Sequence, residues 1–101
     1  PPPPPARMLV FADEFRLGTS RARLPAGRVV IQVRSIGEDD HDLRVRRSDG
    51  TVAGATPVVH PGRLAQLRLR LRPGRYTLYC GLAGHEAAGM RARLVVTRRA
   101  R

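Results

Sequence analysis

The chain has 101 residues, which allows one hydrophobic core and is too short for two. Its hydrophobic content of 42% is that of a globular protein, and no apolar run is long enough to cross a membrane. All 19 basic residues are arginines and only eight residues are acidic, so the net charge of +11 favours partners with acidic or anionic surfaces.

The first six residues are dominated by five consecutive prolines, which can neither form a helix nor pair in a sheet. We interpret residues 1–6 as a proline-rich tether and residues 7–101 as a single domain. Because the chain begins with proline rather than methionine, we expect a processed product or a piece of a longer protein. A signal peptide or membrane anchor would then lie outside this sequence.

From residue 7 onward the hydrophobic pattern is that of β-strands. Side chains alternate between apolar and polar, and Gly, Pro or Asp interrupts the pattern about every ten residues. The segment 51–60 is less regular, and we expect it to cross between sheets with one short strand or a turn of helix. The pattern predicts an all-β sandwich of about seven strands, antiparallel or mixed. The expected strands are 7–11, 27–36, 41–47, 65–72, 75–80 and 90–97, with the seventh in 51–60.

Scarce residue types cluster near the end of the chain. The only cysteine, a histidine and one of two methionines are spaced as Cys80-x4-His85-x4-Met90. Successive side chains of a strand point to opposite faces, so Cys80 should share the inward face of Leu78, and Met90 that of Leu94. By the same argument His41 points inward, in step with Leu43 and Val45.

These four side chains suit copper. Two imidazoles, a thiolate and a weak axial thioether are the ligand set of a blue-copper site. The glycines and alanines between Cys80 and Met90 would let the chain curl closely around a metal ion. The sequence therefore predicts that His41, Cys80, His85 and Met90 bind one copper ion, Cu(I) or Cu(II).

Other interpretations of these residues remain open at this point. Cys80 could be a buried structural cysteine. As the only cysteine it cannot form an internal disulfide, but this excludes no other role. Zinc accepts Cys and His, although a thioether suits it poorly. A Cys–His nucleophile would need an orienting group and an oxyanion hole, for which there is no local signature. His60 precedes a turn proline and is interpreted as an exposed turn residue, but it is the substitute for His41 if that assignment fails.

Two segments resemble the cupredoxin family, the small blue (type 1) copper proteins that include plastocyanin, azurin and rusticyanin. The first is LPAGRVVIQVRSIGEDDHDLRV at residues 24–45, and the second is LRPGRYTLYCGLAGHEAAGMRARLVV at 71–96. The resemblance implies a Greek-key β-sandwich. It also implies that His41, Cys80 and His85 are equatorial copper ligands, with Met90 axial.

The resemblance further implies a carrier of single electrons between redox partners, such as a cytochrome or oxidase, in the periplasm or on the outer face of a membrane. The positive charge suggests that the partner has an acidic docking surface, and four aromatic residues are too few to favour nucleic acid. An enzyme is not expected. Multicopper oxidases place histidines beside the cysteine, and binuclear copper centres need a second cysteine. The alternative function is a copper-binding module with a delivery, storage or structural role in a larger protein.

One position departs from the family pattern. Many cupredoxins carry asparagine after the first histidine, where its amide braces the cysteine loop, whereas this chain has Asp42. The alternation of side chains along residues 41–47 predicts that Asp42 points to solvent. If Asp42 instead braces the loop, its charge should favour Cu(II) and lower the reduction potential.

Overall fold

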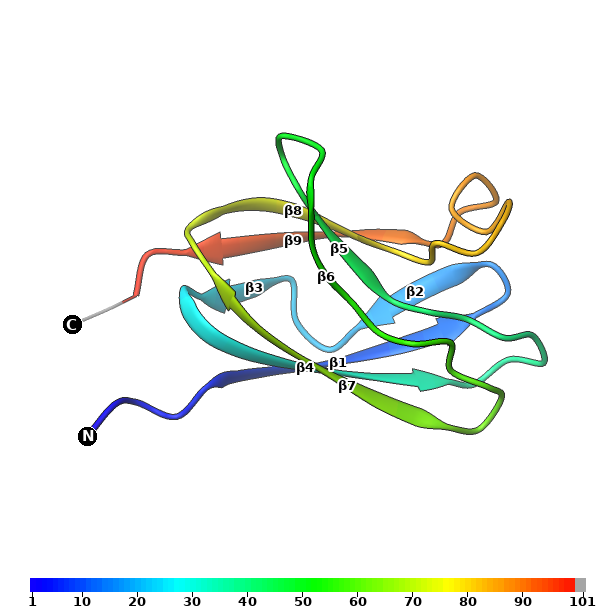
Figure 1. Ribbon diagram of the computed structural model, residues 1–101, viewed down its shortest axis with the longest axis horizontal. Coiled ribbons are helices and arrows are strands. Elements are labelled where there is room, and N and C mark those ends of the chain that lie inside the picture. Colours follow the sequence, from blue (N-terminus) through cyan, green and yellow to red (C-terminus); the bar gives the residue numbers. More distant parts are fainter. Residues whose placement is uncertain (100–101) are drawn as a thin grey trace.

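Two β-sheets packed face to face form the molecule, as the computed structural model of residues 1–99 shows (Figure 1). One sheet has the strand order β2-β1-β4-β7 and the other β3-β9-β8-β5-β6. The described residues form nine strands and no helix. The strands are β1 (Ala6–Asp13), β2 (Arg16–Thr19), β3 (Arg23–Pro25), β4 (Gly27–Ser35), β5 (Arg44–Arg47), β6 (Val52–Ala55), β7 (Leu64–Leu71), β8 (Gly74–Tyr79) and β9 (Arg91–Thr97).

Both sheets are mixed. The β1–β4 and β3–β9 pairs are parallel, and the other strand pairs are antiparallel. The predicted all-β sandwich is confirmed, with nine strands in place of about seven. The additional strands are β2 and β3, which hold only four and three residues and have no clear alternation that would reveal them. The irregular segment 51–60 contributes β6 and a single bridge at Val59.

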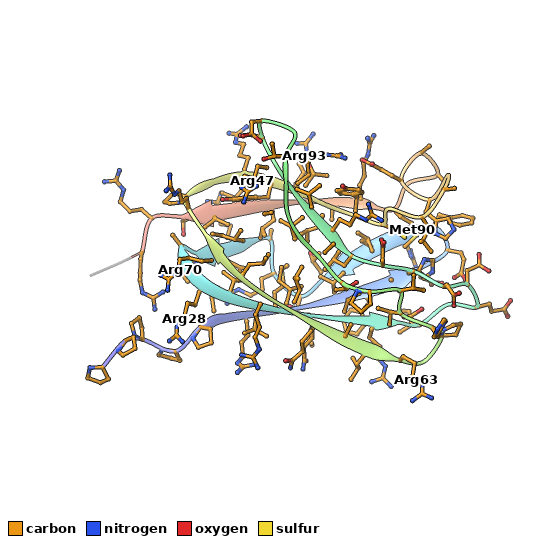
Figure 2. All side chains as sticks on the ribbon, in the orientation of Figure 1. Arg28, Arg47, Arg63, Arg70, Met90 and Arg93 are labelled. Carbon is orange, nitrogen blue, oxygen red and sulfur yellow. The ribbon has the colours of Figure 1, made fainter. Side chains whose placement is uncertain are left out.

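The core lies between the sheets, where the apolar members of each alternating strand meet. Val29, Ile31 and Val33 of β4 face Leu94 and other residues of the opposite sheet in one buried cluster. Each such side chain stabilises the fold by about 1.5–3 kcal/mol relative to exposure. The arginines alternate with these residues and extend outward from both sheets (Figure 2).

Val30 departs from the alternation. Alternation along β4 places it on the same face as Gln32 and Arg34, yet it is 2% exposed. Its register neighbours on the two flanking strands are Arg7 and Arg68, whose aliphatic stems can cover an apolar side chain between them.

The proline segment has no regular structure before β1, which begins at Ala6, one residue earlier than predicted. A hydrogen bond connects it to the domain, since Arg28 Nη2 donates to the carbonyl of Pro3 at 2.8 Å. The predicted domain extends to residue 101, and positions 100–101 lie outside the described residues. Within residues 1–99 the structure contains no helix that is long and apolar enough to cross a membrane.

Candidate metal centre

The four predicted ligands come from three places in the chain that meet at one end of the sandwich. This end lies opposite the N-terminus and the end of β9 (Figure 1). His41 lies between β4 and β5 and is fixed by two backbone hydrogen bonds to Val59, of 2.6 and 3.1 Å. Cys80 directly follows β8, Met90 directly precedes β9, and His85 lies in the loop between them. The backbone N–H of Cys80 donates to the Met90 carbonyl at 3.1 Å, which closes this loop at its base.

The donor atoms of three of these residues converge. Nδ1 of His85 lies 3.5 Å from the Cys80 sulfur, and Nδ1 of His41 lies 4.0 Å from it. The three ligand atoms all lie within 4.8 Å of one another. Nitrogen and sulfur atoms bound to one ion at about 2.0 and 2.3 Å, 120° apart, would be separated by about 3.7 Å. The observed separations therefore fit a shared trigonal metal ion.

The site is largely shielded from water. His41, Cys80 and Met90 are 0% exposed, whereas His85 is half-buried. Burial raises the pKa of the Cys80 thiol, and the backbone N–H of Asp42, 3.4 Å from the sulfur, opposes this rise by favouring the thiolate. A buried thiolate needs a positive partner, and a metal ion between the two imidazoles would provide one.

The prediction that Asp42 points to solvent is wrong. Asp42 is 3% exposed, because regular pairing begins only at Arg44 and the strict alternation does not reach residues 41–42. Its Oδ1 atom accepts a 2.6 Å hydrogen bond from the backbone N–H of Gly81, and its Oδ2 atom accepts one of 3.2 Å from Arg44 Nε. Asp42 therefore braces the loop that follows Cys80.

The turn between β1 and β2 contacts two of the predicted ligands, His41 and His85. The Phe15 ring meets the His85 ring edge-on with 5.1 Å between centroids. Glu14 lies beside His41, with 3.9 Å between Glu14 Oε2 and His41 Nε2. The backbone N–H of Asp39 is the main cause of a lowered Glu14 pKa. Sequence reasoning missed both residues, since neither shows a spacing or strand pattern that points to the site.

His60 is separate from the cluster. Its side chain is 70% exposed, and its Nδ1 atom pairs with the Asp40 carboxylate at 2.8 Å. The structure thus brings His41, and not His60, together with Cys80 and His85. Met90 is buried at the base of the loop, where its backbone forms hydrogen bonds of 3.1 Å with the backbones of both Cys80 and His85.

The sequence matches no protein-family model, and no curated protein is significantly similar to it. Solved structures do share its fold. Auracyanin B superposes with a TM-score of 0.79 at 20% identity over 95% of this chain and 92% of that one. Auracyanin A, a "blue" copper protein from Chloroflexus aurantiacus, gives 0.73 at 15% identity over 93% and 100%. Reduced rusticyanin gives 0.67 at 18% identity over 90% and 78%.

These likenesses concern the fold, because all three identities are low. Together with the nine strands in two mixed sheets, they confirm the predicted Greek-key sandwich of the cupredoxins. The convergence of two imidazoles and a thiolate beside a buried methionine fits a blue copper site. The chain thus has the cupredoxin fold, with a cluster at one end of the sandwich whose chemistry suits copper.

Proposed function

We propose that this protein is a type 1 copper protein that carries single electrons between redox partners. His41, Cys80 and His85 would be the equatorial ligands, and Met90 the axial one. The observation that carries the proposal is the approach of both Nδ1 atoms to the buried Cys80 sulfur, at 3.5 and 4.0 Å. Copper, when bound, would supply the one-electron couple between Cu(I) and Cu(II).

The protein's contribution is to hold the donor atoms in place. Cys80 and Met90 stand at the ends of paired strands, and His41 is anchored to Val59. The hydrogen bond between Gly81 and Asp42 connects the residue after Cys80 to the residue after His41. A site that is fixed from several elements changes little in shape when its charge changes, and small rearrangement favours fast electron transfer.

His85 is the ligand nearest to solvent and is therefore the expected point of exchange with a partner. Around it lie Leu82, half-buried, and the exposed Ala83, Ala87 and Ala88. Small apolar side chains allow close approach, and transient redox partners bury little surface. We further propose an extracytoplasmic location and an acidic partner such as a cytochrome or oxidase, which rest on the family resemblance and on the net charge.

A catalytic role is not part of the proposal. Substrate chemistry at a metal needs an open position, whereas Met90 and the closed loop would occupy the remaining side of this one. The alternative is a copper-binding module that delivers, stores or structurally uses copper within a larger protein. It would need the same ligands but no fast, reversible redox cycle.

The test is the visible absorption spectrum of the purified protein after addition of Cu(II) and then of ascorbate. The Cys80→Ser variant is the control, because it keeps the size of the side chain and removes the sulfur. We expect an intense blue thiolate band that ascorbate bleaches and that the variant lacks. A colourless wild-type protein would overturn the copper assignment. A band without reversible bleaching and recovery would favour the alternative function.

A further inference from the structure

His41 carries an unusual buried atom. Among the described residues, its Nε2 is the one buried side-chain nitrogen or oxygen without a hydrogen-bond partner. The other ring nitrogen, Nδ1, is the one that faces the Cys80 sulfur. A neutral imidazole that gives the lone pair of Nδ1 to a metal carries its proton on Nε2. Metal binding would therefore make Nε2–H a donor that needs an acceptor, because burying it unpaired is unfavourable.

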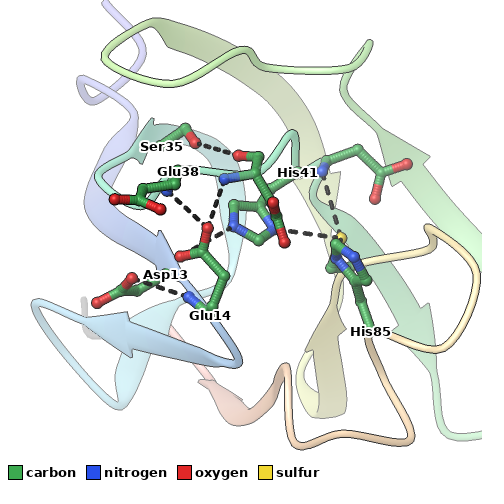
Figure 3. A network of polar contacts seen from close by, with 9 residues as sticks. Asp13, Glu14, Ser35, Glu38, His41 and His85 are labelled. Atoms are coloured by element: carbon green, nitrogen blue, oxygen red, sulfur yellow. Dashed lines mark hydrogen bonds and ion pairs between the residues drawn. The ribbon is translucent and has the colours of Figure 1, made fainter.

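An acceptor lies close by. Glu14 Oε2 is 3.9 Å from His41 Nε2, and the Glu14 side chain is only 22% exposed (Figure 3). A shift of about 1 Å would bring this pair to an ordinary hydrogen-bond distance. The Glu14 carboxylate also packs closely against Gly37, since a Cβ atom at Gly37 would overlap it.

The two oxygens of Glu14 have separate surroundings. Oε1 accepts hydrogen bonds from the backbone N–H groups of Glu38, at 2.6 Å, and Asp39. Oε2 is the oxygen that faces His41. The loop therefore fixes the carboxylate through one oxygen and leaves the other directed at the imidazole. Asp13 Oδ1 in turn accepts a 2.8 Å hydrogen bond from the Glu14 backbone N–H.

We propose that Glu14 is a positioning residue of the metal centre, whose Oε2 receives the Nε2–H of His41 when Nδ1 binds copper. This inference rests on the proposed function. A carboxylate in this place fixes the orientation and tautomer of the ring and makes the imidazole a stronger donor. A stronger donor stabilises Cu(II) more than Cu(I), so Glu14 lowers the reduction potential.

Because the two Glu14 oxygens have different partners, the Glu14→Gln variant can change one interaction and keep the other. A glutamine can keep its carbonyl oxygen on the Glu38 and Asp39 N–H groups, but it then turns its NH₂ group towards Nε2–H. The hydrogen bonds from the Glu38 and Asp39 N–H groups are kept, and the acceptor for the His41 Nε2–H is lost. The matched control is Glu38→Gln, which removes the same charge from the same region at an exposed side chain, leaving the backbone N–H of residue 38 in place.

Two quantities are measured on each copper-loaded protein: the reduction potential, and the NMR chemical shift of the His41 Nε2 proton in the diamagnetic Cu(I) form. In Glu14→Gln we expect a higher potential and an upfield shift of the Nε2 proton. Glu38→Gln should leave the proton unchanged and raise the potential much less. In Glu14→Gln, unchanged backbone amide signals of Glu38 and Asp39 would show that their hydrogen bonds to residue 14 persist.

The wild-type protein provides a measurement that does not depend on the folding of a variant. Its Cu(I) form should show the Nε2 proton far downfield, with a nuclear Overhauser effect to the side chain of Glu14. Absence of this contact, or equal shifts in potential for Glu14→Gln and Glu38→Gln, would overturn the inference. If wild-type protein forms no thiolate band with Cu(II), the proposed function itself fails, whatever Glu14 does.

Discussion

Asp42 Oδ1 accepts a 2.6 Å hydrogen bond from the backbone N–H of Gly81, which links the neighbours of His41 and Cys80 across 39 residues of sequence. The Asp42→Ala variant removes this acceptor and leaves a part-buried N–H unpaired. We expect it to lower the free energy of unfolding by about 1–3 kcal/mol. Chemical denaturation of the metal-free protein measures this change. An unaltered unfolding midpoint would show that the hydrogen bond does not hold the loop.

Asp42→Asn separates the charge of this residue from its bracing role. The amide oxygen can still accept from Gly81, so stability should change less than in Asp42→Ala, while loss of the negative charge should raise the reduction potential. Arg44, which donates to Oδ2 at 3.2 Å, already compensates part of that charge. The rise caused by Asp42→Asn should therefore be larger in an Arg44→Gln background. Equal rises in both backgrounds would contradict this coupling.

The convergence of His41, Cys80 and His85 could be predicted from the sequence because strand patterns and residue scarcity point to the same residues. Leu43, Val45 and Leu78 are all 0% exposed, as their alternation predicts. His41 and Cys80 are buried as predicted, although both lie just outside the regular strands and their sequence neighbours Asp42 and Tyr79 are buried too. The spacing of Cys80, His85 and Met90 indicated a ligand loop without any knowledge of the fold.

What sequence reasoning missed depends on contacts between distant segments. Asp42 is buried because β5 starts two residues later, which no pattern in residues 41–47 reveals. Glu14 reaches His41 only because the β1–β2 turn and the loop after β4 meet at one end of the sandwich (Figure 3). Single acidic residues in turns are common, so nothing local marks this one.

Gly89 should be indispensable to the shape of the ligand loop. Its φ of +122° is unfavourable for side chains, and a Cβ atom there would lie 2.9 Å from the Phe15 carbonyl oxygen. We expect Gly89→Ala to destabilise the metal-free protein by about 1–3 kcal/mol and to weaken copper binding. Gly18→Ala is the control, since its nearest neighbours would be 3.9 Å away. Similar melting temperatures for the two variants would contradict the expectation.

Met90→Leu tests the axial assignment. The two side chains have similar volume, so the substitution should cost about 1.5 kcal/mol of stability or less. Loss of the thioether donor should destabilise Cu(II) relative to Cu(I), and we expect a higher reduction potential with the blue band retained. Cyclic voltammetry and the visible spectrum measure the two effects. A potential equal to that of the wild-type protein would show that Met90 belongs to the core and is not a ligand.

The turn between β5 and β6 should give a pH-dependent contribution to stability that is independent of the metal centre. Asp49 Oδ1 accepts hydrogen bonds from the Thr51 hydroxyl, at 2.6 Å, and backbone N–H, at 2.9 Å, and these bonds lower the pKa of Asp49. A lowered folded-state pKa means that the contribution is complete above the unfolded-state pKa and disappears as pH falls through the folded-state value. The Asp49→Ala variant should therefore be less stable than wild type at pH 7 but not in strong acid. Thermal unfolding measured at both pH values checks this, and a constant difference would contradict it.

The uneven charge of the molecule should appear in its reactions with small redox reagents. At about 0.01 M salt the Debye length is about 30 Å, which is comparable with the 42 × 27 × 19 Å extents of the protein, so the net charge of +11 should dominate. At about 0.15 M the length falls to about 8 Å, and only charges near the site matter. The acidic residues Asp13, Glu14, Glu38 and Asp39 line one groove beside His41, so the local charge differs from the net charge.

In stopped-flow measurements, oxidation of the reduced protein by ferricyanide should slow as salt is added, while oxidation by a cationic cobalt(III) complex should accelerate. Opposite slopes would mean that the acidic groove governs encounter, and the partner would then be expected to present a basic surface in place of an acidic one.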